Sequence, residues 1–183
     1  MALIHLVRHG RAAAGWDTDV DPALDELGHS QAVAVAVALA EKGPLEVVSS
    51  PLRRCRETAA AYAGPRSIDV AVAEEVREIP SPEGYSMDDR VDWLRSSMAG
   101  EWGALDTRYT NYRDHVVQYV SALSSPTVVF SHFVAINAVI GACLGDDRLV
   151  IRRLDNCSVT TVANDGGTLT LVSGGSEADT LIR

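Results

Sequence analysis

Short apolar runs alternate with longer helical segments along the whole chain, and this alternation limits the folds open to it. The apolar runs cover residues 2–7, 45–49, 68–72 and 127–130, and each is the length of a buried strand. Strands that alternate with helices form an α/β fold. We therefore predict a three-layer sandwich with a largely parallel central sheet and helices on both faces.

The helices are predicted from composition and from their ends. An unbroken Val and Ala run over residues 32–40 follows Gly28-His29-Ser30-Gln31, which predicts a helix that starts after Gln31. Ser50 and Pro51 suit the N-cap and the first position of a second helix. Two apolar runs at residues 158–163 and 169–172, joined by Asn-Asp-Gly-Gly, predict a hairpin near the end of the chain.

Size and charge narrow the classes of protein further. The 183 residues suit one domain, and we treat residues 1–183 as such. The net charge of −9 disfavours nucleic-acid binding, which depends on basic patches. We find no apolar stretch of about 20 residues and no signal peptide, so we expect no membrane association and a cytoplasmic location. The three scattered cysteines indicate neither a disulfide framework nor a zinc site.

Cationic residues gather where three predicted strands end. Arg8-His9-Gly10 follows the first strand, Arg53 and Arg54 lie just beyond the second, and Ser131-His132 follows the later one. Parallel strands would bring these sets to one edge of the sheet, where α/β proteins bind ligands. Two arginines and two histidines converging there fit a phosphoryl group, because the guanidinium fork matches phosphate oxygens.

The chain resembles the histidine phosphatase superfamily, the phosphoglycerate mutase-like proteins, in four segments that occur in the family's order. Leu6-Val7-Arg8-His9-Gly10 is similar to the family's R-H-G signature. The other three segments are Asp21 to Ala32, Ser49 to Ala59 and Ser131-His132.

The resemblance implies a role for each matching residue. His9 would be the nucleophile, Arg8 and Arg54 would bind the phosphoryl oxygens, and His132 would complete the cationic pocket. Arg54, rather than Arg53 or Arg56, is in the family's register. Glu78 best matches the family's general acid. A nucleophilic histidine must be neutral, which nearby cations favour.

Several positions depart from the family pattern. Arg11 stands where Glu or Asp is usual, and Asp25 where Thr is common. Trp16-Asp17 only loosely matches the usual Trp-Asn. Phe133 follows the second histidine in place of Gly, so its backbone N–H remains a phosphate donor while its ring would narrow or line the pocket.

These features favour a phosphatase that hydrolyses a phosphomonoester or another phosphorylated small molecule through a phosphohistidine on His9. No metal or cofactor is expected. The alternatives are a phosphoglycerate mutase and a noncatalytic phospholigand-binding protein. Residues of about 80–113 would form a cap insertion, and Trp93, Trp102, Tyr109 and Tyr112 there either contact substrate or belong to the core. The sequence leaves the substrate and a homodimer open.

Overall fold

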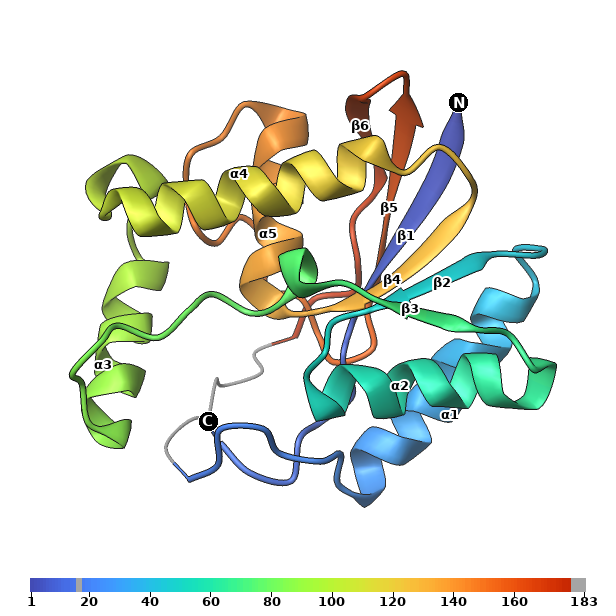
Figure 1. Cartoon of the computed structure of the whole chain (residues 1–183), viewed down its shortest axis with the longest axis horizontal. Helices are drawn as coiled ribbons and strands as arrows, with labels where there is room; N and C mark the ends of the chain where they lie inside the picture. The colour runs from blue at the N-terminus through green and yellow to red at the C-terminus, as the bar shows by residue number, and fades with distance from the viewer. Residues whose placement is uncertain (16–17, 179–183) are drawn as a thin grey trace.

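The computed structural model describes residues 1–15 and 18–178, which form one six-stranded sheet with helices on both faces (Figure 1). The order of the strands across the sheet is β3 (Val70–Val72), β2 (Glu46–Ser49), β4 (Thr127–Ser131), β1 (Ala2–Arg8), β5 (Val159–Asp165) and β6 (Thr168–Ser173). The first four run parallel, and β5 and β6 add antiparallel pairings at one side. The predicted α/β fold with a largely parallel sheet is confirmed.

The three strands that precede the cationic residues are direct neighbours and end at nearly the same level. Arg8 at the end of β1 pairs with Ser131 of β4, and Ser49 of β2 pairs with Phe130. Residues that follow these strands therefore leave the sheet at one edge, where ligands bind in open α/β sheets.

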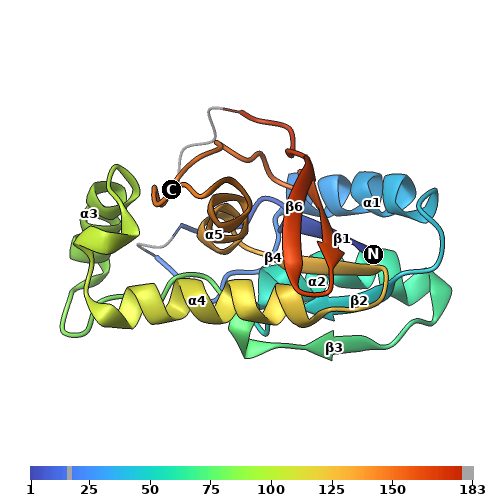
Figure 2. The same ribbon diagram turned by 90° about the horizontal axis from the view of Figure 1, so that it is seen from above.

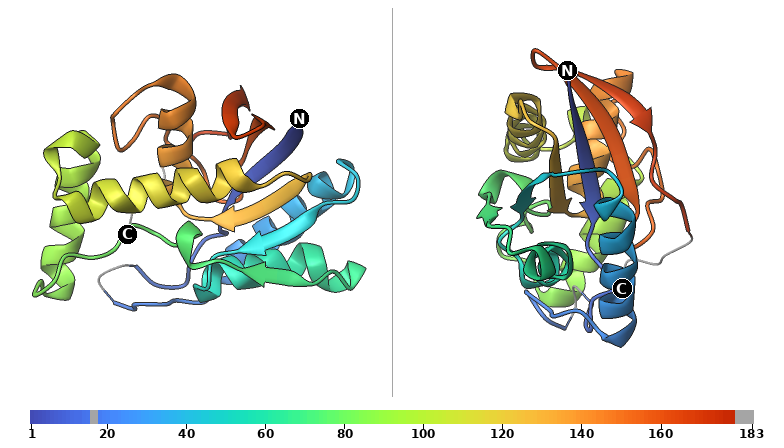
Figure 3. Two further views of the ribbon diagram at one scale, coloured as in Figure 1. Left: turned by 45° about the horizontal axis from the view of Figure 1, so that its top comes forward. Right: turned by 90° about the vertical axis from the view of Figure 1, so that its right-hand side faces the viewer.

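The helices form two layers. Helices α1 (Glu26–Ala40) and α2 (Arg53–Ala63) lie below the sheet in Figure 1, whereas α4 (Thr107–Ala122) and α5 (Phe133–Leu144) lie above it. Helix α3 (Met87–Met98) lies beyond α5, on the side toward which the carboxyl ends of β1, β4 and β2 point (Figures 2 and 3). Three short 3-10 turns, Gly64–Arg66, Glu74–Val76 and Trp102–Ala104, complete the regular structure of the described residues.

Alternation along the strands divides the core between the two faces. Val7, Val128 and Phe130 are buried in the cluster formed with α1 and α2. Their strand neighbours Leu6 and Val129 belong to the larger cluster under α4 and α5. Successive strand side chains point to opposite faces, so both faces of the inner strands need an apolar cover. Within the described residues no helix combines the length and the apolar character that crossing a membrane requires.

Two predicted helix starts are wrong, and capping explains both. Helix α1 begins at Glu26 rather than after Gln31, because the Asp25 side chain accepts the backbone N–H of Gly28 at 2.7 Å and caps the helix there. Ser50 is not the N-cap of α2; Leu52 is, without a side-chain cap of its own. Instead, Asp21 accepts the backbone N–H of Arg53 at 2.7 Å from a distant loop.

The remaining predicted elements are confirmed. The hairpin forms as β5 and β6, and the apolar run at 68–72 contains β3.

Two glycines allow the loop after β1 to cross the first turn of α1 at close range. A Cβ atom on Gly28 would lie 2.1 Å from the Arg11 carbonyl oxygen, and one on Gly10 would lie 2.6 Å from the Gly28 carbonyl oxygen. Both obstacles are backbone atoms, so neither can turn aside.

We expect Gly28→Ala to lower the free energy of unfolding by about 1–3 kcal/mol, the usual cost of forcing extra atoms into a packed contact. Gly64→Ala is the matched control, because nothing lies within 4 Å of its Cβ position and its φ of −56° suits alanine. Urea unfolding of both variants measures the difference, and equal effects would contradict the close crossing.

Candidate active site

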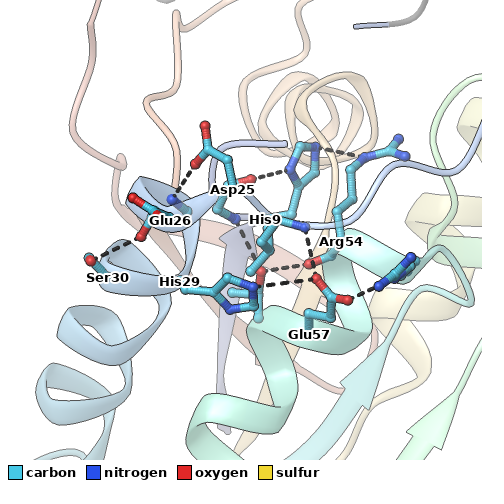
Figure 4. A network of polar contacts seen from close by, with 12 residues as sticks. His9, Asp25, Glu26, His29, Ser30, Arg54 and Glu57 are labelled. Atoms are coloured by element: carbon cyan, nitrogen blue, oxygen red, sulfur yellow. Dashed lines mark hydrogen bonds and ion pairs between the residues drawn. The ribbon is translucent and has the colours of Figure 1, made fainter. Parts of the chain in front are cut away.

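His9 leaves the end of β1 with one ring nitrogen fixed and the other facing an arginine. Its side chain is buried, and Nδ1 lies 2.8 Å from the Gly10 carbonyl oxygen. A carbonyl only accepts hydrogen bonds, so Nδ1 carries the proton. Nε2 then has a lone pair, which accepts from Nε of Arg54 at 3.1 Å (Figure 4). His9 is therefore held as the tautomer that presents Nε2 to the site.

Arg54 connects the two histidines. It lies in the first turn of α2 and is only 3% exposed. Its Nη2 lies 3.1 Å from Nδ1 of His132, and the two imidazole rings are 5.2 Å apart between centroids. Because a guanidinium only donates, Nδ1 of His132 must be the unprotonated nitrogen. Nε2 of His132 then carries the proton and donates it to the Ser50 hydroxyl at 2.8 Å.

The surroundings keep both imidazoles neutral. Burial is the largest cause that lowers the pKa of His9, and the charges of Arg54 and Arg8 lower it further. Burial also lowers the pKa of His132 well below its usual value, followed by the charge of Arg54. Each neutral imidazole therefore keeps a lone pair, and both lone pairs lie next to the positive charge of Arg54.

Arg8 and Phe133 pack against each other beside His9. Arg8 is buried, and its Nη1 donates to the Leu154 carbonyl at 2.5 Å. Its guanidinium carbon lies 5.1 Å from the centre of the Phe133 ring, within reach of a cation–π contact. The Phe133 ring thus lies against Arg8, and its backbone N–H belongs to the first residue of α5.

Glu78 approaches the same site from the segment after β3. Its Oε1 accepts the backbone N–H of Ile79 at 3.0 Å and that of Val134 at 3.2 Å. Desolvation raises the pKa of this half-buried carboxyl, although those two N–H groups and the charges of Arg54 and Arg8 oppose the shift. Glu78 and Arg54 both line a cavity of about 410 Å³, which places a carboxyl with a raised pKa beside the guanidinium.

The neighbouring candidates of the same residue types are exposed, although Glu74 also lines the cavity that contains Arg54 and Glu78. Arg53 and Arg56 are exposed, and Nε of Arg53 donates to Glu57 at 2.8 Å. Glu74 and Glu75 are also exposed, and Glu74 pairs with Arg77 at 2.9 Å. Of the arginines, Arg54 is the one that contacts His9, and of the three carboxylates Glu78 is the half-buried one that lines the cavity with Arg54.

Sequence reasoning missed two residues that hold the backbone around His9. Thr58 donates its hydroxyl proton to the Arg54 carbonyl at 2.7 Å and accepts the backbone N–H of Gly10 at 3.1 Å. Asn156 donates from Nδ2 to the His9 carbonyl at 3.0 Å. Thr58 lies inside a motif that resembles the family, which was a usable signal. Asn156 follows no motif, and 147 residues separate it from His9.

The segment from Asp21 to Ala32 supports the site from outside. Arg11 donates from Nε to Asp25 at 2.5 Å, so the charge expected to act near the pocket is paired with a carboxylate. Glu57 on α2 accepts the backbone N–H of Leu24 at 2.8 Å and so links α2 to the segment that precedes α1 (Figure 4). Asp25, which departs from the family's Thr, still supplies the helix cap. Trp16-Asp17 lies outside the described residues.

The aromatic residues near residues 93–112 divide between the core and the cavity. Trp102 and Tyr109 are buried in the core, and half-buried Trp93 stacks on Tyr109 with 4.9 Å between ring centres. Tyr112 lines the cavity that contains Arg54, and its hydroxyl donates to the Arg77 carbonyl at 2.8 Å. Across the described part of the chain, no three His, Cys, Asp or Glu side chains gather in a metal-ligating cluster.

Comparison with known families gives a match over nearly the whole chain. Residues 4–176 match the model of the histidine phosphatase superfamily (branch 1). A glucosyl-3-phosphoglycerate phosphatase of Mycolicibacterium vanbaalenii is 38% identical over 77 residues, which are 40% of this chain and 34% of that protein. The matched segments cover from 34% to 56% of the length of the first curated relatives.

Solved structures share the fold. A phosphoserine phosphatase from Entamoeba histolytica, solved with 3-phosphoglyceric acid, superposes with a TM-score of 0.76 at 24% identity, covering 96% of this chain and 98% of that one. A mycobacterial glucosyl-3-phosphoglycerate phosphatase solved with VO3 gives 0.75 at 22% identity, with 98% and 100% covered. At such identities the likeness establishes the fold alone.

The lowered pKa values predict the titration of the folded protein. We expect NMR at about pH 6 to show neutral His9 and His132, protonated at Nδ1 and Nε2 respectively, whereas unfolded histidines titrate near 6.5. Below that value the unfolded chain binds protons that the folded chain does not, so stability falls as the pH falls. His5, whose pKa burial lowers to about 4, adds to this loss.

Between about pH 7 and about pH 5.5 each such histidine should lower the free energy of unfolding by about 1 kcal/mol. Urea unfolding at the two pH values measures the summed loss in the free energy of unfolding. Imidazole signals of His9 or His132 that titrate at or above 6.5 in the folded protein would show that the site does not hold these two histidines neutral.

Proposed function

The chain belongs to branch 1 of the histidine phosphatase superfamily, and we propose that it is a phosphatase that hydrolyses a phosphomonoester through a covalent phosphohistidine on His9. The observation that carries the proposal is the tautomer of His9. Its Nδ1 proton is held by the Gly10 carbonyl, so the lone pair of Nε2 faces Arg54 and His132. A nucleophile needs this lone pair and a cationic site for the phosphoryl oxygens.

In the first step, Nε2 of His9 attacks phosphorus and the bond to the ester oxygen breaks. Arg54 exchanges its contacts with the two histidines for contacts with phosphoryl oxygens, and Arg8 supplies a second positive charge. His132 and the backbone N–H of Phe133 complete the phosphate-binding set, with His132 donating its Nε2 proton to a phosphoryl oxygen in place of the Ser50 hydroxyl. Charge spreads over the equatorial oxygens in phosphoryl transfer, so fixed positive groups supply most of the catalysis.

Glu78 is the general acid of this step. It gives its proton to the leaving oxygen, which departs as an alcohol. Its raised pKa supports this role, because the carboxyl keeps its proton to a higher pH than an exposed glutamate. In the second step the Glu78 carboxylate takes a proton from water, the water oxygen attacks phosphorus, and the N–P bond breaks to release phosphate and neutral His9.

Residues of about 80–113 act as a cap over this pocket within a single domain. Pro80 and Ser81, Arg90 of α3, and Arg108 and Tyr112 of α4 line the same cavity as Arg54 and Glu78, which supports this assignment. The substrate is a phosphorylated small molecule. Relatives named for glucosyl-3-phosphoglycerate and for phosphoserine support this class of substrate.

We expect His9→Ala to abolish labelling by a radioactive phosphoryl donor, because the substitution removes the Nε2 lone pair that attacks phosphorus in the proposed mechanism. Wild-type enzyme quenched during turnover should carry an acid-labile, alkali-stable phosphoryl group. The matched control is His115→Ala, which removes an exposed histidine of α4 and should label normally.

Label that persists in His9→Ala would refute the nucleophile. The group that finally accepts the phosphoryl group, water or another hydroxyl, is tested with 3-phosphoglycerate. A phosphatase transfers the phosphoryl group to water and releases inorganic phosphate. Rapid conversion to 2-phosphoglycerate with little release would identify the mutase alternative, and binding without labelling or turnover would identify a noncatalytic protein.

We expect Glu78→Gln to slow the hydrolysis of an alkyl phosphate by about 10²–10⁴-fold, the usual contribution of a general acid. p-Nitrophenyl phosphate should be affected much less, since nitrophenolate leaves without a proton. Glu75→Gln, an exposed neighbour in the same segment, should change neither rate. Equal losses for the two substrates would assign Glu78 to binding or folding rather than to proton transfer.

A further inference from the structure

Helix α1 exposes an apolar surface that the proposed chemistry does not use. Between Glu26 and Glu41 the chain carries no Asp, Glu, Lys or Arg, and residues 32–40 are Val, Ala and Leu alone. A helical stretch that is apolar all round is ordinarily buried on every side. Yet α1 lies along the border of the molecule, and no other described element covers its outer side (Figure 2).

The outer side of α1 has the periodicity of a helix-pairing surface. Five exposed residues follow one another at steps of three or four positions and so share one face of the helix: Leu27, Ser30, Ala34, Val37 and Ala38. We call these five residues the α1 seam. Val37, in its middle, is 62% exposed. The opposite face of the same helix packs into the core, so the two sides of α1 are equally apolar but only one is covered.

Exposed apolar side chains also lie on the sheet, on the side that α1 occupies. Leu3 of β1 and Val172 of β6 are both exposed. Their strand neighbours Ile4 and Leu171 pack in the cluster under α4 and α5, so Leu3 and Val172 point to the other side of the sheet. With the three on α1, they make up half of the ten large exposed apolar side chains among the described residues. Such a concentration on one side indicates an interaction surface.

The two ends of α1 carry opposite charges that are free to pair. Glu26 lies in the first turn, and Lys42, the only lysine of the chain, lies just beyond the last turn. Both are exposed, and among the described residues neither the Glu26 carboxylate nor the Lys42 ammonium forms an ion pair. Glu26 precedes Ala34 by eight residues, and Lys42 follows it by eight. Two antiparallel copies of α1 related by a two-fold axis at Ala34 therefore bring Glu26 of each copy to Lys42 of the other.

Charge also distinguishes between the partners that could cover the seam. Helices that lie on a membrane surface carry lysines and arginines along their polar side, and α1 has none between its two ends. The net charge of −9 repels anionic lipids, and it repels further copies of the chain at long range as well. At the seam itself a second copy meets no like charge, and the opposite charges at the two ends attract each other. The chemistry of the surface therefore favours a second copy of this chain.

We propose that the α1 seam is the contact surface of a homodimer in which two copies of α1 pack antiparallel about a two-fold axis at Ala34. Ser30 of each copy lies opposite Ala38 of the other, so the two helices approach closely. Packing of the apolar side chains supplies the affinity, and the pairs of Glu26 and Lys42 set the direction of the helices. Helix α1 is about 22 Å long, so this interface belongs to the small, weakly associating class. The inference does not depend on the proposed phosphatase function.

Sedimentation velocity of the full chain, from about 1 µM to about 500 µM, tests the association, because a small interface gives a Kd of about 1–100 µM. Ala34→Glu should raise that Kd by at least about tenfold, since it places two carboxylates against each other at the axis. The matched control is Ala40→Glu, the same exchange at an exposed position of the same helix, about 120° around from Ala34. Val37→Glu, at another exposed residue of the seam, is a second disruptive variant.

A zero-length carbodiimide, which joins a carboxylate to an amine, tests the direction of the helices. In an equal mixture of unlabelled and isotope-labelled protein, cross-linked peptides of mixed label come from two different copies. We expect mixed peptides that join Lys42 to Glu26. Glu26→Gln should remove these peptides and leave most of the dimer, because an exposed ion pair contributes only about 0–1 kcal/mol.

A chain that stays monomeric over the whole concentration range would overturn the inference, as would a dimer that survives both Ala34→Glu and Val37→Glu or is weakened equally by Ala40→Glu. Mixed peptides that join Lys42 only to other carboxylates would overturn the antiparallel pairing. Binding to phosphatidylserine vesicles through the seam, without a dimer, would make a membrane the partner and refute the proposal. Far-UV circular dichroism and urea unfolding check that each variant keeps its fold, which exposed Ala→Glu exchanges in a helix preserve.

Discussion

The guanidinium of Arg54 lies between two neutral imidazoles, donating from Nε to His9 and from Nη2 to His132. The rest of the site depends on this arrangement. It fixes which nitrogen of each ring has the lone pair, and its charge helps to keep both rings unprotonated. The three residues come from the ends of β1 and β4 and from the helix after β2, so the pairing of these parallel strands brings them together.

The backbone around His9 is held from several directions. Gly10 passes the first turn of α1 at a distance that excludes a side chain, and Thr58 and Asn156 bond the main chain on either side. A nucleophile needs this kind of support because small displacements reduce the reaction rate steeply. Residues 80–113 contribute a different lining to the cavity, with half-buried Arg90 and exposed Arg108 among its members. The firmly held backbone around His9 thus lies close to a more exposed cavity lining.

Much of the fold could be predicted because its signals are local. Apolar runs of strand length and alanine-rich helical segments define the α/β alternation, and cationic residues at strand ends indicate where a ligand would bind. The errors occurred where a distant or unexpected partner caps a helix. Asp25 starts α1 early, and Asp21 accepts the first N–H of α2 from another loop, which leaves Ser50 to accept a hydrogen bond from His132. Such choices depend on which loop lies nearby in three dimensions.

The sequence by itself determined the strands and the cationic residues that follow them, and through the family resemblance it proposed His9 as the nucleophile, because motif spacing and apolar periodicity are properties of the chain. Only the tertiary structure decided their protonation and their partners. The lowered pKa values of the histidines, the raised pKa of Glu78 and the support from Asn156 arise from burial and from charges brought close by folding. The cavity has the same origin, since Arg54, Glu78 and Tyr112 come from separate segments and line it together only in the folded chain.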